Sequence, residues 1–173
     1  MKSMESHETP MAFNASMLRK SFGHVPSGVV ALCALVDEEP VGTVLSTFIP
    51  VSLDPPLVAV SLQNGSRTWN TLRDRPRLGV TILSESQGII ARSLAAPGPD
   101  RFKDVDYAAF DSDAIRIGGG VGYFECALRS EHQAGDHVLA VMDVHSVDVV
   151  TPRLPLVFHC SDFVAIGGKQ TAA

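Results

Sequence analysis

The chain has 173 residues, enough for one domain with a sizeable hydrophobic core. Apolar residues make up 45% and charged residues 19%, with a mean hydropathy of +0.15, which excludes an intrinsically disordered chain. The formal net charge of −5 provides no overall attraction to nucleic acid or to an anionic membrane. We therefore expect neither among its partners.

The first twelve residues are polar and rich in methionine, which predicts a flexible N-terminal tail. They lack the apolar core of a signal peptide, and the run Val29–Val36 is far shorter than the roughly 20 residues of a spanning helix. The sparse cysteines Cys33, Cys126 and Cys160 have no CxxC spacing. They indicate reduced, buried thiols and a cytoplasmic protein.

The first predicted element is a short amphipathic helix that Asn14 or Ser16 caps and Gly23 ends. Strands follow over 29–36 and 41–48, joined by the turn-forming run 37–40. The apolar residues of the helix lie on one face at helical spacing, namely Phe13, Met17, Leu18 and Phe22.

After a third strand over 57–62, the segment NGSRT predicts a helix start, with Ser66 or Asn64 as cap. A fourth strand over 78–83 precedes a helix over 84–96, in which Ile89, Ile90 and Leu94 are expected to point inward. Residues 97–114 are rich in turn formers and predict a long surface loop.

Two long strands over 122–133 and 137–150 predict a hairpin, and a last strand runs over 155–166. The elements add up to about six or seven strands and two or three short helices, connected mostly by short turns. This pattern predicts a mainly β fold, a closed or nearly closed antiparallel barrel. It occupies residues 13–168, and residues 169–173 form a short C-terminal tail.

Several kinds of site find no support in the sequence. A Gly-x-Ser-x-Gly nucleophile turn is missing, and Cys33 and Cys126 lie inside apolar strands. The histidines of the long hairpin share no ligand spacing, so no metal is predicted. The run Gly118–Gly120 opens a strand, whereas a dinucleotide-binding loop opens a helix.

Polar groups at strand ends remain as candidates. Ser46, Thr47 and Ser52 interrupt the apolar stretch VLSTFIPVSLDPP, where their hydroxyls either cap turns or face something polar that is not protein. The helix start at NGSRT offers free N–H groups and Arg67, so it is either an anion site or a helix capped by Ser66.

From Met17 to Phe163 the chain resembles the flavin reductase family with the FMN-binding split-barrel fold. Its members are the small reductase components of two-component flavin monooxygenases. The resemblance rests on motifs that occur in the order typical of the family, namely LRKSFGHVPSGVVAL, GTVLSTFIPVSLDPPLVAVSL, SRTWNTLR, DRF, AGDHVLAVMDV and PLVFHCSDF.

The resemblance implies roles for particular residues. The flavin would lie along a wall formed by Val44, Leu45, Ser46, Thr47, Phe48, Pro50, Val51 and Ser52. Its phosphate would lie at Gly65, Ser66 and Arg67, and the loop with Arg101 and Phe102 would border the site. The catalytic residue would be His137, which would meet the nicotinamide, and Phe158 and Phe163 would close that pocket, across a dimer interface.

Some positions depart from the family pattern. Val44 replaces a threonine, Thr47 a serine and Pro50 a serine, so hydrogen-bonding groups are lost near the flavin, at about 0.5–1.5 kcal/mol each. Phe158 and Phe163 replace tyrosines, and the glycine of the last motif is missing.

The implied activity is an NAD(P)H-dependent flavin reductase, a homodimer that supplies reduced FMN or FAD to a separate monooxygenase. The sequence leaves FMN against FAD and NADH against NADPH open. Two alternatives are a flavin-binding carrier or regulator without turnover, and a barrel that no longer binds flavin.

Overall fold

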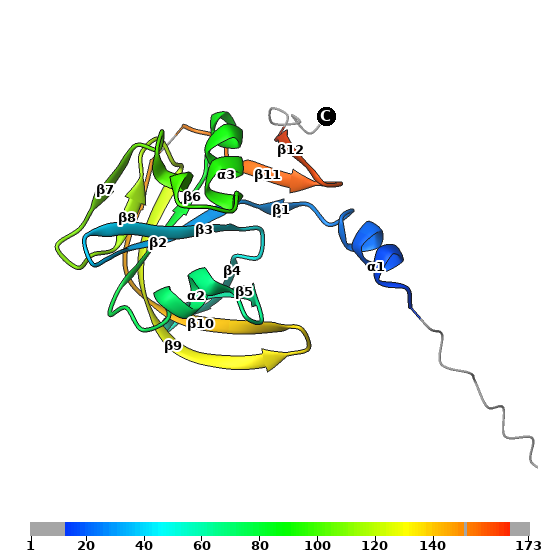
Figure 1. The fold of residues 1–173 in the computed structure, drawn as a ribbon, viewed down its shortest axis with the longest axis horizontal. Helices are drawn as coiled ribbons and strands as arrows, with labels where there is room; N and C mark the ends of the chain where they lie inside the picture. The colour runs from blue at the N-terminus through cyan, green and yellow to red at the C-terminus, as the bar shows by residue number, and fades with distance from the viewer. Residues whose placement is uncertain (1–12, 151, 167–173) are drawn as a thin grey trace, which may run out of the picture.

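The computed structural model describes residues 13–150 and 152–166 (Figure 1). The predicted tails 1–12 and 169–173 lie outside these residues. The helices within them are α1 (Ala15–Phe22), α2 (Arg67–Leu72) and α3 (Gly88–Ala95), with 3₁₀ turns η1 (Glu85–Gln87) and η2 (Asp100–Phe102). The strands are β1 (Ser27–Gly28), β2 (Val30–Val36), β3 (Glu39–Leu45), β4 (Ile49–Leu53), β5 (Pro56–Gln63), β6 (Leu78–Ile82), β7 (Tyr107–Ala109), β8 (Ile115–Ile117), β9 (Gly122–Ala134), β10 (His137–Val149), β11 (Leu156–His159) and β12 (Asp162–Ala165).

The main sheet has seven strands in the order β3-β2-β6-β9-β10-β5-β4, and every neighbouring pair is antiparallel. A small sheet of β1, β11 and β12 lies at one end, beside α3, and α1 projects beyond it (Figure 1). The predicted mainly β, antiparallel architecture is confirmed. No helix in the described ranges is long and apolar enough to span a membrane.

Strand β2 shows why the stretch VVALCALV is apolar without interruption. Leu32 packs into the core cluster inside the curved sheet, with Leu72, Leu78 and Met142. The alternate residue Cys33 packs into a second cluster outside the sheet, with α3, β8 and β11. Because both faces of the strand are buried, the alternation of polar and apolar residues that marks a half-exposed strand is absent.

Two details of the predicted helices and loops were wrong. The helix expected over 84–96 is split, because its first residues form the 3₁₀ turn η1 and α3 begins only at Gly88. This start determines which residues of α3 face the core. Ala91 and Leu94 are fully buried, whereas Ile89 is 82% exposed and points away from the core. The expected loop over 97–114 contains η2 and the short strand β7.

The single strand predicted over 155–166 is instead a hairpin of two strands, β11 and β12. The chain turns at Cys160 and Ser161, whose φ angles of 50° and 67° lie in the left-handed region. Strand β12 therefore folds back on β11, with Phe158 opposite Phe163. A further strand, β4, follows residue 48 and pairs with β5, although the sequence pattern placed only a turn there.

Candidate functional site

A cavity of about 350 Å³ lies where β3 and β5 end and β10 begins. We call it the sheet-end cavity. Strand ends present backbone N–H and C=O groups that have no partner strand, and here they lie beside small hydroxyl side chains. The lining residues are Thr43, Val44, Leu45, Ser46, Thr47, Ser61, Leu62, Gln63, Ser66 and His137.

Thr47 fixes the wall of this cavity. Its hydroxyl donates to the Ser61 carbonyl and accepts from the Ser61 N–H, each at 3.0 Å. The bonds join the segment between β3 and β4 to Ser61 of β5, and they continue the pairing of Ile49 in β4 with Ala59 in β5. The Thr47 hydroxyl thus holds this segment against β5 and keeps the neighbouring Ser46 at the cavity.

His137 stands on the opposite side, at the first position of β10 and opposite Gln63 of β5. Its Nδ1 lies 2.8 Å from an Asp136 carboxylate oxygen. The hydrogen bond from His137, together with the charge of its ring, lowers the pKa of the Asp136 carboxyl. The imidazole is 39% exposed, so it is oriented and remains accessible.

The turn before His137 is tied to the loop before α2. The Asn64 N–H donates to the Asp136 carbonyl at 3.0 Å, and the Asn64 side-chain amide donates to the Gly135 carbonyl at 3.1 Å. These bonds hold the His137 turn and the start of α2 at fixed positions relative to each other.

A second cavity of about 580 Å³ adjoins the first. We call it the hairpin cavity, because the β11–β12 hairpin forms one wall. It shares Ser46, Thr47 and His137 with the sheet-end cavity. The other lining residues are Arg19, Phe22, Gly23, Val25, Ser27, Phe158 and Ser161. The two spaces therefore meet at three residues of the predicted site.

Ser66 caps α2, and it is one of the two caps, Ser66 or Asn64, that the sequence predicted. Its hydroxyl accepts the Trp69 N–H at 3.3 Å. The N–H groups of Arg67 and Thr68 belong to the first turn, where a helix supplies no acceptor. The capping interpretation therefore holds and leaves these two donors for another partner.

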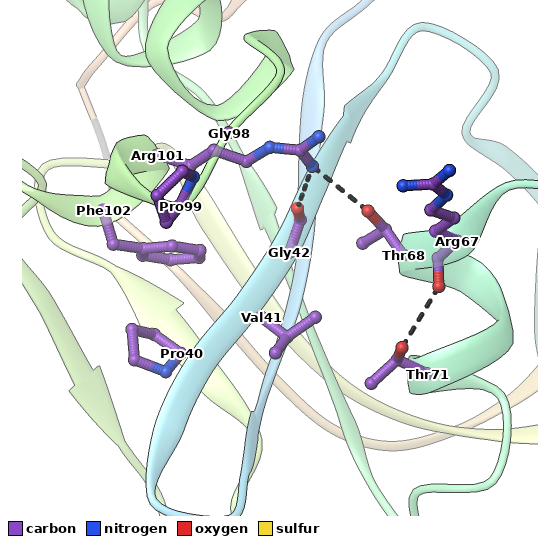
Figure 2. Close-up of a pocket in the computed structure, with 10 residues that line it drawn as sticks. All are labelled: Pro40, Val41, Gly42, Arg67, Thr68, Thr71, Gly98, Pro99, Arg101 and Phe102. Atoms are coloured by element: carbon purple, nitrogen blue, oxygen red, sulfur yellow. Dashed lines mark hydrogen bonds between the residues drawn. The ribbon is translucent and has the colours of Figure 1, made fainter.

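A third pocket of about 270 Å³ lies between α2, β3 and η2, and we call it the arginine pocket (Figure 2). The Arg101 guanidinium donates to the Gly42 carbonyl at 3.3 Å and to the Thr68 hydroxyl at 3.1 Å. Its buried Nε has no hydrogen-bond partner among the described residues. Figure 2 shows Arg67 reaching the same side of the pocket from α2. Two cations at one opening favour an anionic ligand.

The structure thus places most of the predicted site residues at the three cavities. Val44, Leu45, Ser46, Thr47, Ser66 and His137 line the sheet-end cavity, Phe158 lines the hairpin cavity, and Arg67, Arg101 and Phe102 line the arginine pocket.

Other predicted residues lie elsewhere. Phe48 packs on the core beside Phe124, with ring centroids 5.4 Å apart. Gly65 faces a pocket behind α2, and Phe163 packs against Phe158 and under the Arg92 guanidinium. The rest lie on β4, outside the three cavities, namely Pro50, Val51 and Ser52.

Sequence reasoning missed several lining residues. Ser61 and Gln63 line the sheet-end cavity from the end of β5, and Arg19 lines the hairpin cavity from α1. The alternation of Ser61 and Gln63 with buried Leu62 was a usable signal, because it marks a strand with one polar face.

The cysteines divide into two kinds. Cys33 and Cys126 are buried, and desolvation raises the pKa of each thiol to about 12, so neither is a nucleophile. Cys160 is exposed on the turn between β11 and β12, so the prediction of three buried thiols was wrong for this residue. Its turn position is the reason, because a hairpin tip lies outside the core.

Comparison with known proteins identifies the family. The chain matches the family model described as "Flavin reductase like domain" over residues 22–167. It belongs to this family. The resemblance noted in the motifs is therefore confirmed, and the chain is an oxidoreductase of the flavin reductase class.

Relatives of known name agree with this assignment. The chain is 30% identical to the reductase subunit HsaB of a flavin-dependent monooxygenase from Mycobacterium tuberculosis, over 88% of this chain and 83% of that protein. It is also 30% identical to the NADH-dependent FMN reductase SmoA of Agrobacterium fabrum, over 78% and 77% of the two chains.

A solved structure shows the same fold. The NADH:FAD oxidoreductase SgcE6 of Streptomyces globisporus, determined in complex with NAD and FAD fragments, superposes with a TM-score of 0.85. The sequences are 29% identical, and the match covers 90% of this chain and 94% of that one. The predicted fold class is confirmed.

Proposed function

We propose that this flavin reductase-family protein transfers a hydride from NADH or NADPH to FMN or FAD and releases reduced flavin to a separate monooxygenase. One observation carries the proposal beyond family membership. The sheet-end and hairpin cavities meet at Ser46, Thr47 and His137. Two adjoining cavities with a common border suit two ring systems that must stack face to face.

The flavin ring fits the sheet-end cavity in our proposal. Backbone groups of Val44 to Thr47 and the Ser46 hydroxyl provide hydrogen-bonding partners along one edge. The Thr47 hydroxyl is occupied by Ser61, so Thr47 acts by holding the wall in place. The cavities are of the size that small-molecule ligands occupy, about 300–1,000 Å³.

The phosphate of the flavin fits the arginine pocket in our proposal. Arg67 and Arg101 supply positive charge there, and Arg101 retains a buried Nε without a partner. A phosphate oxygen would satisfy that donor. The N–H groups of Arg67 and Thr68 add donors beside the Ser66 cap.

The nicotinamide fits the hairpin cavity, where Phe22, Val25 and Phe158 form an apolar wall. His137 lies at the border of both cavities, and its bond to Asp136 fixes the ring plane. Bound flavin supplies the redox chemistry by accepting a hydride at N5. The protein binds and orients the reactants and excludes water between them, so a nucleophilic side chain is unnecessary.

We further propose a homodimer, because exposed apolar side chains on β4 need a cover. Leu53 is 97% exposed, and Ile49 and Val51 are 50% and 52% exposed.

The two unpaired buried thiols, Cys33 and Cys126, favour a reducing compartment, so we also propose that the enzyme works in the cytoplasm.

The test is NADH oxidation by purified protein, first without flavin and then with FMN or FAD added. Oxidation that depends on added flavin and saturates with it supports a reductase and ranks the two flavins. Repetition with NADPH ranks the nicotinamides. Flavin binding without oxidation of either nicotinamide would contradict the proposal and favour the carrier.

A further inference from the structure

Three metal-ligating side chains meet at a place that the proposed reductase chemistry does not use. His24 lies in the loop after α1, while His159 and Cys160 lie at the tip of the β11–β12 hairpin. Their ligand atoms all lie within 4.8 Å of one another. The thiol Sγ is 3.4 Å from Nδ1 of His24 and 3.5 Å from Nε2 of His159.

The two sulfur–nitrogen separations match those of a tetrahedral metal site. Zinc binds thiolate sulfur at about 2.3 Å and imidazole nitrogen at about 2.0–2.1 Å, so two ligand atoms at tetrahedral angles are roughly 3.3–3.6 Å apart. Both sulfur–nitrogen separations fall in this range. The imidazoles meet edge to face, with centroids 6.3 Å apart, so the two rings converge on the sulfur without stacking on each other.

The backbone builds this arrangement. The Cys160 N–H donates to the Gly23 carbonyl at 2.7 Å, which holds the hairpin tip against the residue before His24. Cys160 has a φ of 50°, a conformation that non-glycine residues seldom adopt. This turn places Cys160 toward His24, and both His24 and Cys160 are accessible to an ion from solvent.

We propose that His24, His159 and Cys160 form a site for a borderline-soft divalent metal, with Zn²⁺ as the ion that the ligand set fits best. Two neutral imidazoles and one thiolate are typical zinc ligands, and a fourth position stays open for water. Binding replaces the thiol proton by the metal and releases that proton to the buffer. The negative charge of the thiolate then offsets one of the two positive charges of the bound ion.

The site would have a mechanical effect as well. Helix α1 has no buried residue, so little packing holds it to the barrel. A metal ion would cross-link the segment after α1 to the β11–β12 hairpin. The chain neighbours of the three ligands line the hairpin cavity. They are Gly23 and Val25 on either side of His24, and Phe158 and Ser161 on either side of the pair His159 and Cys160. The metal would therefore hold together two walls of this cavity.

The first experiment titrates the purified protein with Co²⁺, whose spectrum reports thiolate ligation and tetrahedral geometry. Difference spectra against the same protein without cobalt remove any contribution from flavin. We expect a sulfur-to-cobalt charge-transfer band that saturates at one ion per chain and disappears when Zn²⁺ displaces the cobalt. A wild-type spectrum without this band would overturn the proposal.

Variants locate the site. Cys160→Ser should abolish the charge-transfer band, and His24→Ala should weaken Co²⁺ binding at least about tenfold, since loss of an outer partner alone costs that much. His145→Ala is the matched control, because it removes an exposed histidine of β10 and should bind like wild type. A band that persists in Cys160→Ser, or weakens equally in the control, would contradict the assignment.

A thermal measurement tests the cross-link without any variant that must fold. Zn²⁺ should raise the melting temperature of the wild type, since an ion that binds only the folded state stabilises that state. Magnesium, which prefers oxygen ligands, should not. An equal shift with both ions, or none with Zn²⁺, would count against the site. These readouts do not involve NADH or flavin turnover and stand apart from the reductase proposal.

Discussion

The Thr47 hydroxyl bridges both backbone groups of Ser61, with each hydrogen bond at 3.0 Å. This bridge holds the segment between β3 and β4 against β5, and Thr47 borders both cavities of the candidate site. A side chain that sequence reasoning assigned to flavin contact therefore has a structural task, and it shapes the site by performing that task.

Thr47→Val tests this bridge, because valine keeps the shape and removes both hydrogen bonds. We expect the free energy of unfolding to fall by about 0.5–1.5 kcal/mol for each bond lost. We also expect weaker flavin binding, since Ser46 loses its fixed position. Thr47→Ser retains the hydroxyl and is the control. Denaturant unfolding and flavin titration measure both effects, and a valine variant that matches wild type in both would refute the role.

His137→Ala tests the proposed contact with the nicotinamide. We expect the KM for NADH to rise about two- to tenfold, the equivalent of one lost hydrogen bond or packing contact, with a smaller change in flavin affinity. Steady-state kinetics and flavin titration separate the two. The control is His145→Ala on the same strand. Unchanged NADH kinetics in the His137 variant would show that the assigned role is wrong.

Arg101→Met tests the proposed phosphate position. Loss of a charge-assisted hydrogen bond at a partly buried site should weaken FMN binding about tenfold. Binding of riboflavin, which has no phosphate, should change little. Arg67→Met should have a smaller effect, because Arg67 is exposed and solvent screens it. Lys103→Gln, an exposed neighbour outside the pocket, serves as control. Equal losses for FMN and riboflavin would place the phosphate elsewhere.

The cysteines give a prediction on pH and reactivity. A thiol whose pKa is raised to about 12 is deprotonated in only about one molecule in ten thousand at about pH 8. Because Cys33 and Cys126 are also buried, iodoacetamide should label Cys160 alone in the native protein from which a chelator has removed any metal. Peptide mass spectrometry identifies the labelled residue. In denaturant all three should react, and native labelling of Cys33 or Cys126 would contradict their burial.

The substitution Gly79→Ala tests the packing of β6 against β8. A Cβ atom at this position would lie 1.9 Å from the Ile115 carbonyl oxygen, a contact that only backbone movement relieves. We expect Gly79→Ala to destabilise the fold by about 1–3 kcal/mol or more. Gly28→Ala is the control, because nothing lies within 4 Å of the added Cβ there. Thermal unfolding measures the difference, and equal melting temperatures would contradict the described packing.

Local patterns predicted much of this fold. A helix cap at Ser66 or Asn64 was predicted before Trp69 and Leu72, and Ser66 is the cap. Strands β9 and β10 were predicted from two long runs around Ala134–Asp136. These features depend on residues close together in the sequence. Ile89 was misplaced because the start of α3 at Gly88 changes which face is buried, and periodicity alone does not fix that start.

The site was less predictable, because its contacts join distant segments. The bond between Thr47 and Ser61 depends on β4, a strand that the sequence pattern did not predict. The meeting of His24 with Cys160 spans 136 positions. The turn at Cys160 and Ser161 adopts positive φ without a glycine or asparagine, so it gave no turn signal. Motif resemblance singled out His137 and Arg101, which line the sheet-end cavity and the arginine pocket, whereas no sequence pattern indicated the hairpin cavity.

The most direct test of the central claim is reduction of flavin by NADH under anaerobic conditions, followed by loss of the oxidised-flavin absorbance. We predict that the protein accelerates this bleaching, that its rate saturates with NADH or NADPH, and that one nicotinamide is oxidised for each flavin reduced. Flavin that binds to the protein and is bleached no faster than free flavin, with either nicotinamide, would contradict the account.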